Sequence, residues 1–269
     1  MRNIALLIEY DGTAYGGWQI QKNSVSIQGV IEKNLSELLH ESIKIIGAGR
    51  TDAGVHAYGQ VANFHTHSDL DVKKLAYALN GKLPYDIAVR GASDVPENFH
   101  ARFDAATRKY CYKIVTAKSP IARHFAAFFP YNLSTDSMNE ACTSLIGEKN
   151  FKSFTKYADQ QRNFICDVTK ANWKMGEGEG RAENGKRDPQ AMLPPTNSVL
   201  CFEIEANRFL HGMVRAIVGT LVNVGRGKIS VDEFRQIVDA EERSYASMSA
   251  PSCGLFLEEV KYGFDLWGE

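Results

Sequence analysis

Five polar side chains crowd one glycine-rich stretch of the chain, and their types could support chemistry. The stretch GAGRTDAGVHAYGQV begins at Gly47 and carries Arg50, Thr51, Asp52, His56 and Gln60. Its single acid, Asp52, has no second acid, cysteine or metal-ligand cluster beside it in the sequence. Such a carboxylate can act as a nucleophile or a base, or it can bond its own backbone in an Asx turn. The density of polar groups between two apolar segments favours the chemical interpretation.

Phosphate binding is a poor interpretation of these glycines. A dinucleotide-binding loop needs the pattern G-x-G-x-x-G, but Asp52 occupies the third glycine position, where its charge would oppose a pyrophosphate. The run Gly-Ala-Gly-Arg-Thr also lacks the Gly-Lys-Ser/Thr of a P-loop. We therefore do not expect a nucleotide here.

A second candidate is Arg215, which lies in an apolar segment with helical periodicity. The apolar stripe around it consists of Leu210, Met213, Val214, Ile217, Val218 and Leu221. His211, Gly212 and Gly219 share its face of the predicted helix. Glycines in a helix cost about 1 kcal/mol each relative to alanine, but they let another backbone approach closely. Arg215 is either an arginine that reaches water at the helix edge or a partly buried one that pairs with a carboxylate.

A third candidate segment, FHARFDAATRKYCYKIV, interleaves basic and aromatic residues. Arg102, Arg108 and Lys109 alternate here with Phe99, Phe103, Tyr110 and Tyr112. This composition suits stacking on nucleobases beside phosphates. Tyr110 and Tyr112 share one face of a predicted strand, and the alternative is that both belong to the core with their hydroxyls at its rim.

The elements that must position these residues are helices and mostly sequential strands. Strands are predicted at 3–10, 43–46, 61–65, 87–93, 110–116, 168–174, 198–206 and 254–262. Helices are predicted at 27–38, 71–80, 137–145, 208–224 and 232–240. The polar, glycine-rich segment from Met175 to Pro195 predicts a loop between two strands. This order indicates an α+β fold with an antiparallel-rich sheet and an internal duplication.

Composition narrows the class of protein. The chain has 269 residues, 44% hydrophobic and 23% charged, as expected for one or two globular domains. Five scattered cysteines without Cys-x-x-Cys indicate neither a disulfide framework nor a zinc site. No apolar run reaches membrane length, so we expect a cytoplasmic protein without a membrane partner. Because the net charge is −1, any polyanion partner requires basic residues gathered on one face.

Taken together, the motifs resemble the tRNA pseudouridine synthase A (TruA) family. In chain order they are YGGWQ, GRTDAGVHA, FHARF, RKYCY, FLHGMVRAIVGTLVNVGRGK and PSCGLFLEEVKY. The resemblance implies the pseudouridine synthase fold, with two similar lobes, mostly antiparallel sheets flanked by helices, and an active-site cleft between them. We expect an N-terminal lobe at residues 1–106 that carries the GRTD loop. The C-terminal lobe is expected at 107–269, with the Tyr110 strand and the Arg215 helix.

The resemblance also implies an activity. It is the isomerisation of uridine to pseudouridine at positions 38, 39 and 40 of the tRNA anticodon stem-loop, by a homodimer that uses no cofactor or metal. By this likeness Asp52 is the catalytic acid or nucleophile, Tyr110 meets the uracil and Arg215 pairs with Asp52. Arg50 enters the space of the displaced base.

Further basic residues are expected to contact RNA, namely Arg102, Arg108, Lys109, Arg226 and Lys228. For the last two, the alternative is that they only cap a helix through its terminal carbonyls. The chain departs from the family pattern in QRNFI, at 161–165, and in the length of the 175–195 segment, which bears on auxiliary RNA contacts.

Two other functions remain open on the residues alone. A non-catalytic RNA-binding module would explain the basic and aromatic segment, but a carboxylate such as Asp52 repels phosphate. A nucleosidase or glycosidase would generally need a second carboxylate about 5 Å from the first. Asp11 and Glu205 are the candidates for that second acid.

Overall fold

The computed structural model describes residues 1–156, 163–175 and 199–267, so most of the predicted loop at 175–195 lies outside the described residues. Contacts divide the chain into two units. The first contains Met1–Arg108 and Phe256–Glu269, and the second contains Lys109–Leu255. The sequence-based boundaries had assigned Phe256–Glu269 to the C-terminal lobe at 107–269. This segment instead groups with the first unit. The reason is that the C-terminal strand pairs with a strand of the first unit.

The first unit is built on a sheet with the strand order β4-β1-β3-β10. Its strands are β1 (Arg2–Tyr10), β3 (His56–Thr66), β4 (Ile87–Val95) and β10 (Leu255–Tyr262). β1 is antiparallel to β3 and β4, whereas β10 runs parallel to β3. The short strand β2 (Ile46–Gly47) pairs with β3 and leads into the Asp52 turn.

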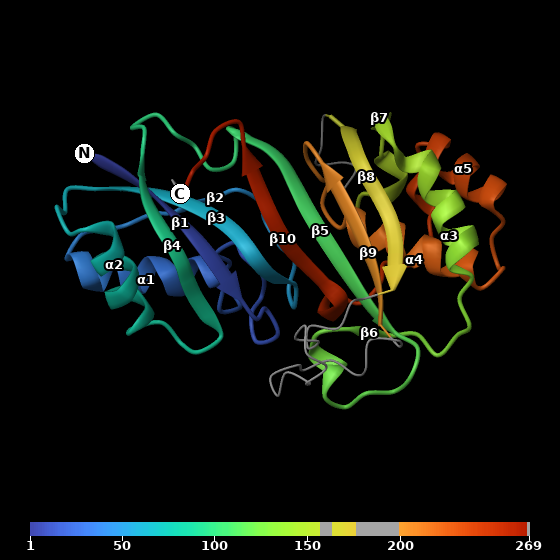
Figure 1. Ribbon diagram of the computed structural model, residues 1–269, viewed down its shortest axis with the longest axis horizontal. Helices are drawn as coiled ribbons and strands as arrows, with labels where there is room; N and C mark the ends of the chain where they lie inside the picture. Colours follow the sequence, from blue (N-terminus) through green and yellow to red (C-terminus); the bar gives the residue numbers. More distant parts are fainter. Residues whose placement is uncertain (157–162, 176–198, 268–269) are drawn as a thin grey trace, which may run out of the picture. The chain divides into compact units, whose positions relative to one another are not determined.

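Two helices complete this unit, α1 (Ile27–Leu39) and α2 (Val72–Asn80), and they lie beside each other (Figure 1). Ser26 is the N-cap of α1, and its side chain accepts a hydrogen bond from the backbone of Gly29. The periodic residues Ile27, Ile31 and Leu35 are buried, as an amphipathic helix requires.

The second unit carries the strand order β5-β9-β8-β7. Its strands are β5 (Ala105–Val115), which starts in the first unit, β7 (Gly147–Asn150), β8 (Ile165–Met175) and β9 (Val199–Ala206). The short strand β6 (Ala127–Phe128) pairs in parallel with β5. β8 is antiparallel to both β7 and β9.

Three helices lie beside β7, β8 and β9 (Figure 1). They are α3 (Thr135–Cys142), α4 (Met213–Gly225) and α5 (Val231–Asp239). Almost all residues of α4 are buried. α4 begins at Met213 and not near Arg208, because Gly212 before it has a left-handed φ of +71°. Short 3-10 turns occur at Ala122–His124, Thr143–Leu145, Lys152–Phe154, Arg243–Tyr245 and Ser252–Gly254.

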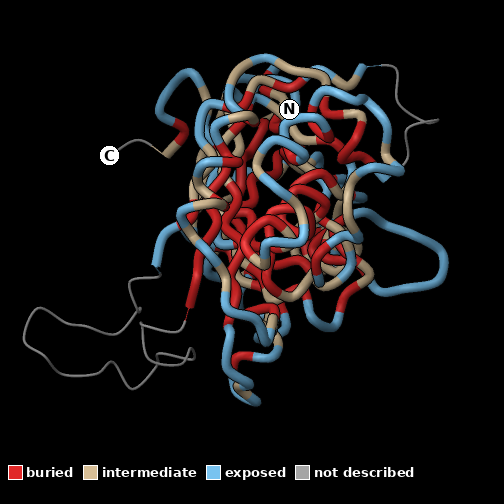
Figure 2. The backbone as a smooth tube through the Cα atoms, turned by 90° about the vertical axis from the view of Figure 1, so that its right-hand side faces the viewer, coloured by how far each residue is buried: buried red, intermediate tan, exposed pale blue. Residues whose placement is uncertain are grey.

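The predicted class is confirmed as mixed α and β structure with mostly antiparallel strand pairs. Buried residues follow the strands and the inner faces of the helices, while the connecting loops are exposed (Figure 2). None of the described helices combines the length and apolar character needed to cross a membrane.

Candidate active site

The turn that carries Asp52 is fastened at its preceding residue, Thr51. Thr51 is buried, and its hydroxyl lies 2.8 Å from the hydroxyl of Tyr10 on β1. The backbone of Trp18 donates to the carbonyl of Thr51 at 3.1 Å, and the Val55 amide donates to that of Asp52 at 3.1 Å. The turn is thus held by β1 and by the YGGWQ segment, both of which lie far from the turn in the sequence.

A glycine beneath the turn explains part of that segment. Gly17 has a φ of +97°, and a Cβ there would lie 2.5 Å from the carbonyl oxygen of Thr51 and 3.0 Å from the carbonyl carbon of Asp52. Any side chain would therefore push the backbone of Asp52 out of place, in addition to the strain of the left-handed conformation. The position requires glycine because the two backbones are in contact.

The fastening leaves the charged side chains of the turn accessible. Arg50 is exposed and Asp52 is half-buried, whereas Thr51 between them points into the unit. Gln60, on β3, donates from its amide to the carbonyl of Gly49 at 2.9 Å. The turn is a rigid support that presents one arginine and one carboxylate.

Two polar residues near the turn have structural contacts. His56 lies within β3, is 1% exposed, and its ring stacks on Phe256 at 4.7 Å. Its Nδ1 is 3.1 Å from the carboxylate of Asp11, which also accepts from the hydroxyl of Thr13 at 2.6 Å. Asp11, one candidate for a second acid, is therefore engaged locally at the end of β1.

Arg108 holds a neighbouring loop against the strand that enters the turn. Its guanidinium donates to the carbonyls of Arg102 at 2.6 Å, Ala105 at 2.9 Å and Ala48 at 3.1 Å. Arg102 itself is exposed, with its guanidinium carbon 5.6 Å from the ring of Phe103. Of these two predicted RNA contacts, Arg102 has the accessible charge. The guanidinium of Arg108 instead donates hydrogen bonds to backbone carbonyls.

In the second unit, Tyr110 and Tyr112 lie side by side on one face of β5. Tyr110 is 7% exposed and packs edge to face against Phe209, with ring centres 5.1 Å apart. Tyr112 is fully buried, and its hydroxyl donates to the carbonyl of Pro251 at 2.7 Å. Burial raises the pKa of Tyr112 far above its usual range. The core alternative thus describes Tyr112 well.

Arg215 lies in the first turns of α4 and is fixed by the segment that follows α5. Its Nε donates to the carbonyl of Ala250 at 2.8 Å, and the Ala250 amide donates back to the carbonyl of Arg215 at 2.9 Å. A Cβ at Gly219 would collide with the carbonyl oxygen of Met248. The inference that glycine admits another backbone is confirmed at Gly219, but His211 and Gly212 precede the helix.

Lys109 belongs to a cluster that the sequence interpretation missed. Its ammonium lies 3.3 Å from the carboxylate of Glu203, which also pairs with Lys170 at 2.7 Å and Lys174 at 2.9 Å. Lys170 and Lys174 lie four residues apart on one face of β8, and Glu203 lies on β9 across from Asn172, which is midway between them. This spacing of the lysines on one strand face was visible in the sequence, but their partner strand was not. Glu205, the other candidate second acid, lies opposite Lys170 on the same strand pair.

The charge of Glu203 is stabilised by this cluster. Burial by itself raises the carboxyl pKa, but the hydrogen bonds from Lys170 and Lys174, together with the positive charges of Lys109 and Lys174, outweigh it and hold the pKa at about 2. The folded state therefore gains stability from this group above its unfolded pKa of about 4.3 and loses it as the pH falls toward 2.

Glu203→Gln is expected to lower the free energy of unfolding by about 2 kcal/mol at pH 7, because three ammonium groups remain together without their carboxylate. Urea unfolding of both proteins between pH 7 and pH 2 measures this. The difference should shrink as the pH falls from about 4 toward 2, because the unfolded wild-type chain takes up a proton in this range that the folded carboxylate takes up only near pH 2. Glu148→Gln, at an exposed position on β7, is the control and should change little. A deficit that does not vary with pH would contradict the assignment.

The two residues at the end of α4 differ from each other. Arg226 stacks on Tyr131, with its guanidinium carbon 3.6 Å from the ring centre, and reaches Asn223 at 3.4 Å. Lys228 is exposed, and its backbone amide donates to the carbonyl of Asn223 at 2.9 Å. These contacts give Arg226 an aromatic partner in place of the helix carbonyls that the capping alternative requires. RNA contact by either residue stays a prediction.

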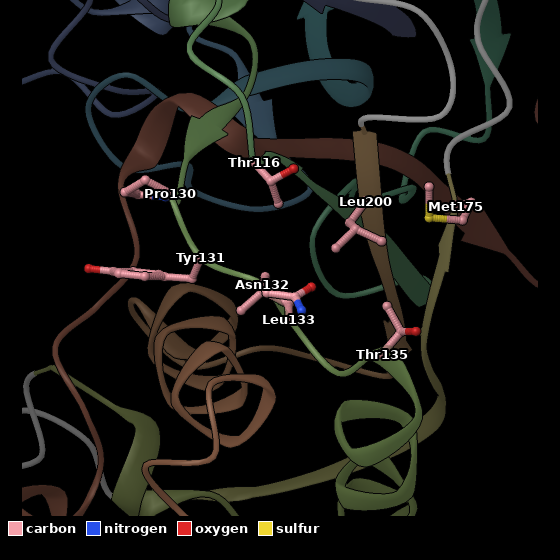
Figure 3. A pocket seen from close by; sticks show the side chains of 8 residues that line it. All are labelled: Thr116, Pro130, Tyr131, Asn132, Leu133, Thr135, Met175 and Leu200. Carbon is pink, nitrogen blue, oxygen red and sulfur yellow. The ribbon is translucent and has the colours of Figure 1, made fainter.

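A pocket of about 540 Å³ in the second unit contains none of the predicted site residues (Figure 3). It is lined by the stretch from Pro130 to Leu133 and by Thr116, Thr135, Met175 and Leu200. Met175 is the residue just before the segment at 176–198, and Leu200 is the second residue after it. The pocket therefore adds nothing to the chemistry of the site.

The predicted site residues are divided between the two units. The first unit carries Arg50, Asp52, Arg102 and Arg108, and the second carries Lys109, Tyr110, Arg215, Arg226 and Lys228. Each unit fixes its own group: Thr51 and Gly17 fix the Asp52 turn, and Ala250 and Gly219 fix the Arg215 helix.

Comparison with known proteins identifies the family. A model of the family described as tRNA pseudouridine synthase matches residues 6–104 and 141–263. A protein of Bacteroides thetaiotaomicron named tRNA pseudouridine synthase A is 41% identical over 269 residues, which cover 100% of this chain and 94% of that protein. Proteins of the same name are 42% identical over 258 residues in Bacteroides fragilis, covering 96% of this chain and 95% of that protein, and 39% identical over 264 residues in a Thermoanaerobacter species, covering 97% and 100%. The chain thus belongs to the tRNA pseudouridine synthase family.

Proposed function

We propose that this chain isomerises uridine to pseudouridine at positions 38, 39 and 40 of the tRNA anticodon stem-loop. The observation that carries the proposal is likeness along the whole chain, about 40% identity, to relatives named tRNA pseudouridine synthase A. We further propose that it acts in the cytoplasm as a homodimer, with the tRNA lying across both subunits. No cofactor or metal enters the proposed reaction.

The proposed site joins residues from both units. Asp52 supplies the reacting carboxylate, Arg215 pairs with it, and Tyr110 meets the uracil in a cleft between two lobes. Arg50 fills the space that the flipped base vacates, since it is adjacent in the turn and exposed. The rigidity of the Asp52 turn and of the Arg215 helix supports this assignment, because a preorganised site keeps reacting groups in place.

The reaction is balanced without any co-reactant. The bond between N1 of uracil and C1′ of the ribose breaks, the base turns, and a bond between C5 and C1′ forms. C5 gives up its hydrogen as a proton, and N1 takes up a proton, so no water is consumed and nothing is oxidised. A single carboxylate can serve as the nucleophile or as the base in such a sequence. This explains why one acid suffices in the Gly47–Val61 stretch.

The test of the proposal is the product formed from an unmodified tRNA transcript. We expect pseudouridine at 38, 39 and 40, with the tRNA chain intact and no free uracil. Release of free uracil would identify a nucleosidase, and binding of tRNA without any product would identify a non-catalytic RNA-binding module. Either outcome would overturn the proposal.

Tyr110→Phe and Tyr110→Ala separate the two roles open to this tyrosine. We expect both variants to lose turnover, because the phenol is the ionisable group proposed to lie over the uracil where C5 loses its proton. Only the alanine variant should also lose base stacking, of about 1–3 kcal/mol. Single-turnover rates and tRNA affinities measure the two effects separately.

Tyr112→Phe is the matched control, since it removes a buried hydroxyl from the next position on the same strand face. We expect it to keep most of its turnover. Near-normal turnover by Tyr110→Phe would exclude the hydroxyl from the proton transfer.

A further inference from the structure

The loop between Phe99 and Ala105 presents one aromatic side chain to solvent. Phe103 is 74% exposed, whereas the other aromatic residues of the same segment are buried: Phe99 is 4% exposed, Tyr110 7% and Tyr112 0%. Single exposed apolar residues are common and by themselves indicate nothing. The surroundings of Phe103 are what distinguish it.

The backbone on both sides of Phe103 is fixed. The amide of Ala101 donates to Asn63 at 2.9 Å, and the carbonyl of Ala101 accepts from the hydroxyl of Tyr262 at 2.8 Å. The amide of Phe103 donates to the carbonyl of His100 at 3.1 Å. Arg108 holds the carbonyl of Arg102 at 2.6 Å. The exposed ring therefore lies on a loop whose backbone is hydrogen-bonded at Ala101, Arg102 and Phe103.

The side chains beside the ring define what it suits. The ring of His100 lies 4.2 Å from that of Phe103, tilted by 31°, and the guanidinium of Arg102 lies 5.6 Å from it. An exposed aromatic ring with a cation beside it matches a nucleobase next to its phosphate. A loop whose backbone is already held also reduces the ordering cost of binding.

The loop is attached to the Asp52 turn. The same guanidinium of Arg108 that holds Arg102 also donates to the carbonyl of Ala48 at 3.1 Å, and Ala48 lies in the stretch that leads into Asp52. All of these residues belong to the first unit. The Phe103 loop and the stretch that leads into Asp52 are thus tied together through one guanidinium.

We propose that Phe103 is a stacking platform for an unpaired nucleobase of the tRNA close to the target uridine, with Arg102 beside it on the phosphate. This inference rests on the proposed function, and it assigns a contact to a residue with no part in the chemical step. Phe103 sets affinity and the placement of the RNA.

Phe103→Ala is expected to weaken tRNA binding and raise KM by about 10- to 100-fold, with kcat at saturating tRNA close to wild type. Phe103→Tyr and Phe103→Trp should restore affinity because they restore the ring. Tyr77→Ala and Tyr85→Ala remove exposed rings of the same unit, 85% and 112% exposed, and are the matched controls. They should bind tRNA as wild type does.

Abasic substitution along the anticodon loop identifies the stacked base. Wild type should lose affinity most at one loop nucleotide, and Phe103→Ala should lose nothing further there. Wild-type affinity in Phe103→Ala, or a loss from the abasic site that is equal in both proteins, would overturn the proposal. A change in oligomeric state in Phe103→Ala would also overturn it and assign the ring to contact with a second copy of the chain. A failure of the proposed function is distinguishable, since wild type itself would then form no pseudouridine.

Discussion

Asp52→Asn is expected to abolish pseudouridine formation while tRNA binding remains close to wild type. The amide keeps the size of the side chain and the half-buried position in a turn fastened by Thr51 and Gly17. It removes the one group that could attack the substrate or accept a proton from it, so turnover should fall by about 10⁴-fold or more. Single-turnover rates with unmodified tRNA, together with a direct binding measurement, test both halves of the expectation.

The matched control is Asp69→Asn, which changes an exposed acid in the same unit. It should leave both rate and affinity unchanged. If Asp52→Asn kept a substantial fraction of wild-type turnover, Asp52 could not be the reacting carboxylate, and the catalytic assignment would have to move to another residue.

Arg215→Met is the second change with a large expected effect. Methionine fills the apolar surroundings of α4 but lacks the positive charge proposed to pair with Asp52. We expect turnover to fall by about 10²–10³-fold, the usual loss when one preorganised charge or donor is removed from a site. Arg215→Lys should recover part of the rate, because it restores the charge but not the Nε bond to Ala250.

Arg235→Met provides the comparison within the same unit. Arg235 lies on α5, where it pairs with Asp232 at 2.8 Å, and its loss should affect neither rate nor binding. Far-ultraviolet circular dichroism and urea unfolding of each variant separate a catalytic defect from a folding defect. Folded Arg215→Met with a wild-type rate would show that the charge of Arg215 is not used in the reaction.

Local features of the fold could be predicted from the sequence where local rules dominate. Ser26 as an N-cap and the buried stripe of α1 follow from side-chain hydrogen bonding and helical periodicity. The start of α4 was misplaced because the apolar pattern continues through Leu210, while the left-handed Gly212 ends the preceding loop. The pattern records burial, and it does not record where the backbone changes conformation.

Contacts between distant segments account for most of what the sequence could not indicate. Glycines in the motifs mark close approaches, but only the structure names the approaching backbone, Thr51 and Asp52 at Gly17 and Met248 at Gly219. The partner of Lys109 was equally hidden, since Glu203 reaches it because β5 and β9 are neighbours in the sheet. Residue types indicated the chemistry of each group, and tertiary pairing decides which groups are held in place.

The most direct test of the account is release of tritium from tRNA transcribed with uridine labelled at C5. Carbon–carbon bond formation at C5 must expel that hydrogen, so wild type should release tritium equal to the number of pseudouridines mapped at 38, 39 and 40. Asp52→Asn should release none from the same bound tRNA. Tritium release by Asp52→Asn at the wild-type rate, or bound tRNA from which wild type releases none, would contradict the assignment of this chain as an Asp52-dependent pseudouridine synthase.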